Sequence, residues 1–228
     1  MSKAPSIFAP LPTVPGGWPC IAPDVPSLFR SNSETKPGKN ARRYYKCHPM
    51  EILATLPVRD IAARDALPWF WTTGPLLAIG AHIPVMRAWG FEPTAIAFVW
   101  QKLNPNAPTL LFSERDFFFG PGLTTRQNAE YVVLGRRGSP KRLAADVRQL
   151  VIAPRRKHSE KPDEVYVRIE RYCAGPRLEL FARKHREGWT CWGDELPLLS
   201  ESAGASDVAP EPILLTSLNR TEAGESLG

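Results

Sequence analysis

Short apolar runs rich in β-branched and aromatic residues alternate along this chain with stretches whose apolar residues recur at helical spacing. This alternation is typical of an α/β domain with a largely parallel sheet. The predicted strands are 20–22 (CIA), 67–73 (LPWFWTT), 95–103 (AIAFVWQKL), 129–138 (AEYVVLGRRG), 149–154 (QLVIAP) and 177–183 (RLELFAR). The predicted helices are 48–56 (HPMEILATL), 75–90 (PLLAIGAHIPVMRAWG) and 161–173 (KPDEVYVRIERYC).

Two prolines refine the predicted helices. Pro162 suits the first turn of the helix at 161–173, where the missing N–H has no helical partner to lose. Pro84 falls inside 75–90 and should kink that helix or divide it into two shorter pieces. The apolar residues that recur at helical spacing within 161–173 are Val165, Ile169 and Cys173.

Length and composition predict one domain with a flanking segment at each end. A chain of 228 residues allows a single domain of ordinary size with a buried core. Residues 1–18 are rich in proline and glycine, which predicts an extended arm. Residues 198–228 are polar and rich in small residues, which predicts a mostly disordered tail. The folded domain is therefore predicted at 19–197.

The charge of the chain favours polyanionic partners. Its formal net charge is +6 and its pI is near 9.3, and clustered Lys and Arg side chains attract nucleic acid. No stretch approaches the roughly 18 apolar residues that a membrane span needs, and the N-terminus lacks the pattern of a signal peptide. We therefore expect a cytoplasmic protein that makes no contact with a membrane.

Several enzyme signatures are missing from the sequence. The chain has no G-x-S-x-G, no G-x-x-x-x-G-K-[ST], no G-x-G-x-x-G and no H-E-x-x-H, which argues against the common hydrolase, phosphate-loop and redox classes. Its 4 cysteines show neither C-x-x-C spacing nor a histidine at zinc-finger spacing. We expect reduced thiols and no metal site.

Candidate functional residues follow two of the predicted strands. Asp24 comes directly after 20–22, and the segment from Glu179 to His185 includes the end of the last predicted strand. Ligands of open α/β sheets bind outside the carboxyl ends of strands. We therefore expect Asp24 and this segment to lie at the same edge of the sheet.

Basic residues concentrate in two runs, 135–142 and 153–158; Arg42 and Arg43 form a further pair, and Arg126 lies in the Gly-rich segment 120–126. Each run follows a predicted strand directly, so we expect both at the edge that carries Asp24. This placement favours a nucleic-acid track beside a pocket, although a run of charges also suits an ordinary solvated surface. The candidate nucleic-acid contacts are Arg126, Arg136, Arg137, Lys141, Arg142, Arg155 and Arg156.

A series of motifs between Ile52 and Glu195 occurs in the order found in one protein family. The segments are EILATLPV, LPWFWTTG, MRAWGF, AFVWQKLNPNAP, GPGLTTRQNAEYVVLGRRGSPKRL, APRRKHSEKPDEVYVRIER, GPRLELFAR and GWTCWGDE. Together they resemble the MT-A family of adenine-N6 methyltransferases, named for the seventy-kilodalton subunit of the mRNA adenosine methyltransferase. The resemblance is to its bacterial and phage DNA branch, and it covers essentially the whole predicted domain.

This resemblance implies a Rossmann-like methyltransferase fold, with helices on both faces of the sheet and S-adenosylmethionine as the methyl donor. The catalytic Asp-Pro-Pro-aromatic motif of the family falls on Asp24, Val25, Pro26 and Ser27, so the first proline and the aromatic residue are replaced. The donor-binding positions that the resemblance implies are Lys161, Glu179, Arg183, His185, Asp194 and Glu195. Asp194 stands where the family has Asn, and a carboxylate can still accept hydrogen bonds from ribose hydroxyls.

The chemistry of adenine shows which replacements matter. Its amino nitrogen attacks a methyl group well only when acceptors hold its N–H groups, and a carboxylate and a backbone carbonyl suffice. Asp24 provides the first, and the carbonyl of Val25 can provide the second. Val25 lacks the fixed φ of proline, and Ser27 lacks the ring that packs against a flipped base. Stacking contributes about 1–3 kcal/mol, so we expect a loss of about ten- to a hundredfold unless Phe29, Tyr44 or Trp71 offers a substitute face.

These observations leave two functional hypotheses and one structural alternative. The first is an adenine-N6 methyltransferase that acts on a flipped adenine in DNA. The second is a catalytically impaired pseudo-methyltransferase that binds nucleic acid or a protein partner. In the structural alternative, Asp24 only caps a turn and the arginines are solvated. The sequence leaves open whether RNA is also accepted and whether the chain forms a homo- or heterodimer.

Overall fold

The computed structural model describes residues 7–28, 47–108, 110–120, 122, 125–156 and 160–197. The predicted tail at 198–228 and the first six residues of the predicted arm lie outside these residues. The strands are β1 (Trp18–Pro23), β2 (Ala62–Thr73), β3 (Glu92–Leu103), β4 (Ala129–Arg136), β5 (Leu150–Pro154), β6 (Arg177–Leu180) and β7 (Thr190–Trp192). The helices are α1 (Met50–Ala54), α2 (Val58–Ile61), α3 (Gly74–Ala78), α4 (His82–Ala88), α5 (Asp163–Tyr172) and the short 3-10 helix η2 (Glu114–Asp116).

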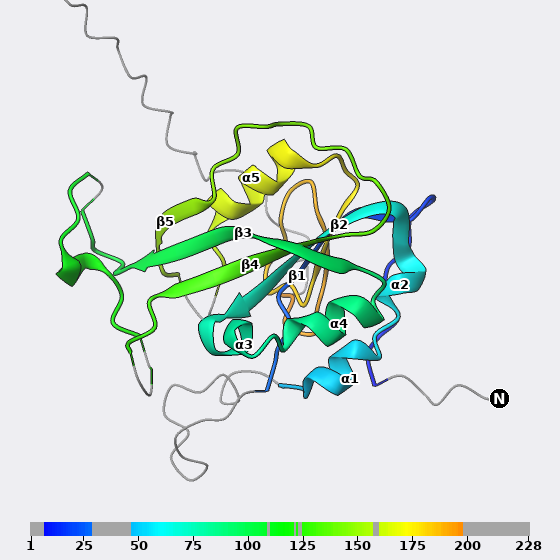
Figure 1. The fold of residues 1–228 in the computed structure, drawn as a ribbon, viewed down its shortest axis with the longest axis horizontal. Coiled ribbons are helices and arrows are strands. Elements are labelled where there is room, and N and C mark those ends of the chain that lie inside the picture. The colour runs from blue at the N-terminus through cyan, green and yellow to red at the C-terminus, as the bar shows by residue number, and fades with distance from the viewer. Residues whose placement is uncertain are drawn as a thin grey trace, which may run out of the picture. The chain divides into compact units, whose positions relative to one another are not determined.

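The strands form one 7-stranded sheet in the order β5-β3-β4-β2-β1-β6-β7 (Figure 1). β1 pairs in parallel with β2 and β6, and the β6·β7 and β3·β5 pairs are also parallel. β4 is antiparallel to both of its neighbours, β2 and β3. The α/β architecture with a mostly parallel sheet is therefore confirmed. β7 was not predicted, because three residues are too few to show a strand periodicity.

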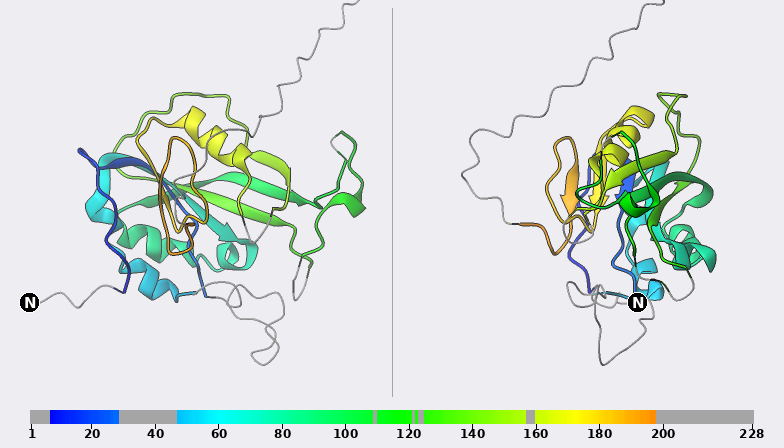
Figure 2. Two further views of the ribbon diagram at one scale, coloured as in Figure 1. Left: turned by 180° about the vertical axis from the view of Figure 1, so that it is seen from behind. Right: turned by 90° about the vertical axis from the view of Figure 1, so that its left-hand side faces the viewer.

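Helices cover both faces of the sheet, as the views in Figures 1 and 2 show. On one face, the helices α1, α2 and α4 contribute to a first hydrophobic core, together with residues of β1, β2 and β6. On the other face, α5 packs against β1 to β5 in a second core. The predicted apolar stripe of α5 is buried there, because Val165 and Ile169 are 0% exposed and Cys173 is 3% exposed. No helix within the described ranges is long and apolar enough to cross a membrane.

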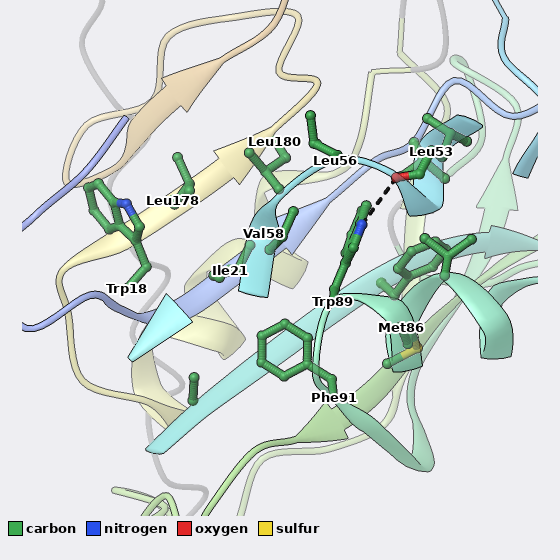
Figure 3. Close-up of a cluster of buried hydrophobic side chains, with 14 of the residues drawn as sticks. Trp18, Ile21, Leu53, Leu56, Val58, Met86, Trp89, Phe91, Leu178 and Leu180 are labelled. Carbon is green, nitrogen blue, oxygen red and sulfur yellow. Dashed lines mark hydrogen bonds between the residues drawn. The ribbon is translucent and has the colours of Figure 1, made fainter. Parts of the chain in front are cut away.

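The first core joins α1 and α4 through a buried tryptophan (Figure 3). Trp89 is 1% exposed, and its indole Nε1–H donates a hydrogen bond to the carbonyl oxygen of Leu53 at 3.1 Å. A buried N–H without an acceptor costs about 1–3 kcal/mol, so this bond fixes the orientation of the ring. It therefore ties α1 to the C-terminal end of α4 on this face of the sheet.

The predicted helix at 75–90 is divided, but Pro84 is not the cause. The break lies at Gly80, whose φ of +66° ends α3 in a left-handed conformation that favours glycine. Pro84 is the third residue of α4, where its missing N–H has no helical partner. The helix predicted at 161–173 begins at Asp163, so Pro162 is its N-cap residue rather than a member of its first turn.

Candidate active site

The direction of the strands determines which side chains meet. The carboxyl ends of β1, β2, β3, β5 and β6 lie at one edge of the sheet, together with the start of β4, because β4 runs the opposite way. We call this the C-terminal edge. Asp24 follows β1 there, and its backbone N–H extends the ladder to β6 by donating to the carbonyl oxygen of Leu180 at 3.1 Å. The predicted location of Asp24 at a strand end is therefore confirmed.

Two cations hold the carboxylate of Asp24. Its Oδ1 lies 3.0 Å from Nζ of Lys161, and its Oδ2 accepts a hydrogen bond from Nη1 of Arg183 at 2.6 Å. Asp24 is only 9% exposed, so both contacts form largely out of water. Charged hydrogen bonds of this length are stronger than neutral ones, and they fix the direction in which the carboxylate points.

Glu130, which the sequence reasoning missed, completes this cluster. It stands opposite Thr73 at the start of β4, and its Oε2 lies 3.0 Å from Nζ of Lys161. Its Oε1 accepts a hydrogen bond from Nζ of Lys102 at 2.5 Å. Lys161 therefore bridges two carboxylates, and it also lies 5.2 Å from the centre of the Trp71 ring.

The opposite charges of Lys161 and Glu130 stabilise each other's ionised forms. Burial alone would lower the pKa of Lys161, but Asp24 and Glu130 more than offset it, so this pKa is raised. Burial also pushes the pKa of Glu130 upward, and Lys161 and Lys102 outweigh that effect and lower it to about 2. Lys161 and Glu130 are therefore both stabilised in their ionised forms.

Glu130→Gln is expected to lower the free energy of unfolding by about 3–5 kcal/mol at neutral pH, because it leaves Lys161 and Lys102 short of a buried partner. The pKa of Glu130 is about 2 in the fold against 4.5 without it. Its stabilisation is therefore present above about pH 5 and is lost as the pH falls through 4.5 toward 2. Denaturation in urea between pH 3 and 7 should show the two proteins converging in acid. Glu164→Gln, on the exposed face of α5, serves as the control; a gap for Glu130→Gln that is constant with pH contradicts the assignment.

Arg183 and Glu195 come together on adjacent loops. Nε of Arg183 lies 3.4 Å from Oε2 of Glu195. Gly193 makes this approach possible, since a Cβ atom at this position would lie 2.5 Å from the carbonyl oxygen of Ala182. Asp194 is exposed beside Glu195. His185 lies on the loop after β6, and its Nε2 is 3.0 Å from the carbonyl oxygen of Pro197.

Glu179 belongs to a separate buried network beneath this loop. Its Oε1 accepts a hydrogen bond from the Tyr166 hydroxyl at 2.6 Å, and its Oε2 lies 3.4 Å from Nε of Arg186. Burial raises the pKa of Glu179, and the charge of Asp24 adds to the rise. Arg186 also pairs with Asp163 at the start of α5. The network therefore ties the loop after β6 to α5, and its contacts gave no sequence signal because they join different elements whose relative positions depend on the fold.

The segment after Asp24 is held by backbone contacts with residue 48. The amide of His48 donates to the carbonyl oxygen of Pro26 at 2.8 Å, and the amide of Leu28 donates to the carbonyl oxygen of His48 at 2.9 Å. The carbonyl of Val25 accepts the N–H of Ser27 at 2.8 Å, which leaves one of its two lone pairs. An acceptor for an adenine amino group therefore remains at residue 25.

Three residues were suggested as substitutes for the aromatic ring that is missing at Ser27, and only Trp71 lies among the described residues. Trp71 is 3% exposed and lies beneath the Lys161 ammonium group, so it offers no open face. Phe29 and Tyr44 lie outside the described residues. The ring of His48, which is tied to the segment after Asp24, instead contacts Phe8 at 5.1 Å between ring centres.

Only some of the candidate nucleic-acid contacts lie at the C-terminal edge. Arg126 lies over the ring of Phe119 at 4.9 Å, and Arg155 lies over Phe118 at 4.6 Å. Arg156 is also at this edge, but its charge is compensated by two acids, Asp163 at 2.5 Å and Glu160 at 3.6 Å.

The prediction that the run 135–142 shares this edge is wrong. It follows the carboxyl end of β4, and β4 is antiparallel to its neighbours. Its basic residues therefore lie at the opposite edge; they are Arg136, Arg137, Lys141 and Arg142.

Comparison with known proteins places this arrangement in a family. Residues 20–195 match the sequence model of the MT-A70 family. A Type II methyltransferase M.MunI from Mycoplasma sp is 36% identical over 156 residues, which cover 67% of this chain and 60% of that protein. The human N(6)-adenosine-methyltransferase catalytic subunit METTL3 is 29% identical over 139 residues, covering 58% of this chain and 22% of METTL3. A Drosophila melanogaster N(6)-adenosine-methyltransferase MT-A70-like protein is 29% identical over 136 residues, covering 58% and 21%. The matches thus span 60% or less of these relatives' own length, and the chain belongs to the MT-A70 family.

Proposed function

We propose that this chain is an S-adenosylmethionine-dependent methyltransferase that transfers a methyl group to the N6 amine of a flipped adenine in DNA. The observation that carries the proposal is the buried carboxylate of Asp24, held at the end of β1 by Lys161 and Arg183. Membership of the MT-A70 family supports the reaction, and the similarity to a Type II methyltransferase from a bacterium supports DNA as the substrate. We place this activity in the cytoplasm.

The residues of the C-terminal edge fit the chemical groups of the donor. The amino-acid end of S-adenosylmethionine carries a carboxylate and an ammonium group, and the ribose carries two hydroxyls. Lys161 and Arg183 match the carboxylate, whereas Asp194 and Glu195 match the ammonium group and the hydroxyls, which leaves Asp24 for the adenine. Bound at these residues, the donor would supply an electrophilic methyl group.

Asp24 then acts on the adenine amine. Its carboxylate accepts one N–H of the amine while the carbonyl of Val25 accepts the other, which draws the nitrogen lone pair out of conjugation. Transfer would form the new N–C bond as the donor's bond between sulfur and the methyl carbon breaks and a neutral thioether leaves, and the positively charged adenine nitrogen would then have to lose a proton. Asp24 would accept that proton, and Lys161 and Arg183 hold its carboxylate in position beforehand.

Aromatic and basic side chains beside the site suit a single strand of nucleic acid. Phe119 is 73% exposed, and the Arg126 guanidinium group covers one side of its ring. Exposed rings stack with bases, and guanidinium groups pair with phosphates. We propose Arg126 and Arg155 as contacts to the strand that carries the target adenine.

The test is methyl transfer from labelled S-adenosylmethionine to single- and double-stranded DNA. Identification of N6-methyladenine by mass spectrometry in adenine-containing oligonucleotides, and of no product in adenine-free ones, supports the proposal. RNA of the same sequence decides between the two substrates. Absence of N6-methyladenine with every nucleic acid, in a preparation that binds the donor, contradicts it. Light scattering of the same preparation tests the homodimer that the sequence leaves open, and a heterodimer would require a second protein.

The second candidate is a pseudo-methyltransferase, and the absence of an aromatic residue at Ser27 favours it. In that case the site binds the donor and the basic surface binds nucleic acid, but no methyl group is transferred. Calorimetry separates the two hypotheses, because the pseudoenzyme shows donor binding without turnover. An enzyme weakened at Ser27 instead shows low turnover that depends on Asp24.

A further inference from the structure

Four arginines gather at the edge of the sheet opposite the C-terminal edge. They line a shallow pocket of about 450 Å³ and come from α2, α4 and the end of β4, with a single acid, Glu92, among them. These arginines are Arg59, Arg87, Arg136 and Arg137, and we call the site the arginine pocket. Its lining carries four positive charges against one negative charge, which concentrates positive potential at this edge.

Internal contacts hold two of the guanidinium groups in place. Arg87 binds Glu92 with two hydrogen bonds, Nη2 to Oε1 at 2.7 Å and Nε to Oε2 at 3.2 Å. Arg137 donates from Nη1 to the carbonyl oxygen of Arg59 at 2.8 Å, and its backbone bridges to Ala66 at 2.9 Å and 3.0 Å. These contacts preorganise the guanidinium groups of Arg87 and Arg137, which form the fixed part of the pocket.

Two glycines shape the backbone around these arginines. Gly90 has a φ of +85°, and a Cβ atom at this position would lie 3.0 Å from Nε of Arg59, so the Arg59 side chain lies across it. Gly138 has a φ of +66° and turns the chain after β4, where the next amide, that of Ser139, donates to Oδ1 of Asp65 at 2.6 Å. This turn leads directly into Lys141 and Arg142, which are exposed.

The remaining two guanidinium groups are available to an anion. Within the part of the chain that the structure describes, no acid pairs with the guanidinium group of Arg59 or Arg136. Both side chains are exposed at the rim of the pocket. Guanidinium groups in this setting match phosphate oxygens, which they bind in a planar, two-pronged manner.

We propose that the arginine pocket is a second nucleic-acid contact, which binds the phosphate backbone of duplex DNA away from the target adenine. The inference rests on the proposed function, which makes nucleic acid the polyanion at hand. From Glu130 to Arg136, β4 spans roughly 20 Å at about 3.3 Å per residue. A duplex rises about 3.4 Å per base pair, so DNA must extend about six base pairs or more beyond the target to reach both sites.

The test compares binding of a 24-base-pair duplex (about 80 Å at 3.4 Å per base pair) and of a six-nucleotide single strand by fluorescence anisotropy at several salt concentrations. The variant is Arg59→Gln with Arg136→Gln, and Arg171→Gln on α5 is the control that removes a cation from the other face of the sheet. Losing two phosphate contacts should lower the slope of log affinity against log salt by about 1.8 on the duplex, because each contributes about 0.9. The wild-type protein and the Arg59→Gln/Arg136→Gln variant should bind the six-nucleotide strand equally well.

An unchanged slope and affinity on the duplex overturns the inference and leaves the pocket for an acidic protein partner. Because binding requires no turnover, the measurement is also made on Asp24→Asn protein. Asp24-dependent methyl transfer together with an unchanged duplex slope means that only this inference fails. A reduced slope without methyl transfer to any nucleic acid means that only the proposed reaction fails.

Discussion

Asp24→Asn is expected to lower the rate of methyl transfer by about a hundred- to a thousandfold, the scale observed when one preorganised electrostatic group is removed from a site. The amide keeps the shape of the side chain but loses the charge that accepts the adenine N–H and the departing proton. Folding should survive, because Lys161 keeps Glu130 and Arg183 keeps Glu195 as partners. Incorporation of labelled methyl groups into adenine-containing DNA under single-turnover conditions measures the effect.

Asp146→Asn is the matched control for this experiment. Asp146 pairs with Arg171 at 2.9 Å on the surface, where an ion pair contributes little to stability, so the rate should stay unchanged. Asp24→Glu retains the charge but moves it by one methylene group, and it should also be slow, because the position of the carboxylate matters as well as its charge. Wild-type rates in Asp24→Asn protein would remove Asp24 from the mechanism.

Ser27→Trp combined with Val25→Pro is expected to raise kcat/KM by about ten- to a hundredfold. The indole restores a face for the flipped base, and base–aromatic stacking is worth about 1–3 kcal/mol. Proline at residue 25 restores a fixed φ after Asp24 and keeps the carbonyl that accepts an adenine N–H. Ser27 is half-buried next to the backbone pairing with His48, so the new ring would project from a held segment.

Ser27→Leu with Val25→Pro separates stacking from simple apolar contact, since leucine adds bulk without a π face. A large gain with Trp and a small one with Leu supports a weakened enzyme that lost its aromatic wall. If the Trp variant folds and binds the donor but transfers no methyl group, the pseudo-methyltransferase hypothesis is the better one.

The sequence was sufficient for the parts of the fold that depend on local patterns. All predicted strands are present, and the stripe of Val165, Ile169 and Cys173 is buried, because the periodicity of apolar residues reports directly on which face is covered. The same reasoning placed Asp24 at the end of a strand. The same reasoning was wrong about the break in 75–90, which it placed at Pro84. The break lies at Gly80, because the conformation of a glycine depends on the packing of the chain after α3.

Of the predicted donor-binding residues, the structure joins Lys161, Arg183 and Glu195 in one set of contacts that includes Asp24. Glu179 instead belongs to the network of Tyr166 and Arg186, and the donor-binding roles of all these residues stay predictions.

The sequence by itself therefore determined most of the strands, the long helix α5, the family, and the position of Asp24 after a strand, since each depends on residues close together in the chain or on their order. Only the tertiary structure decided that β4 runs antiparallel to its neighbours. Because β4 runs in this direction, Glu130 at its start lies beside Lys161 at the C-terminal edge, and Arg136 at its end lies at the opposite edge. The physical reason is that strand direction is set by pairing and packing between distant segments, which local periodicity does not encode.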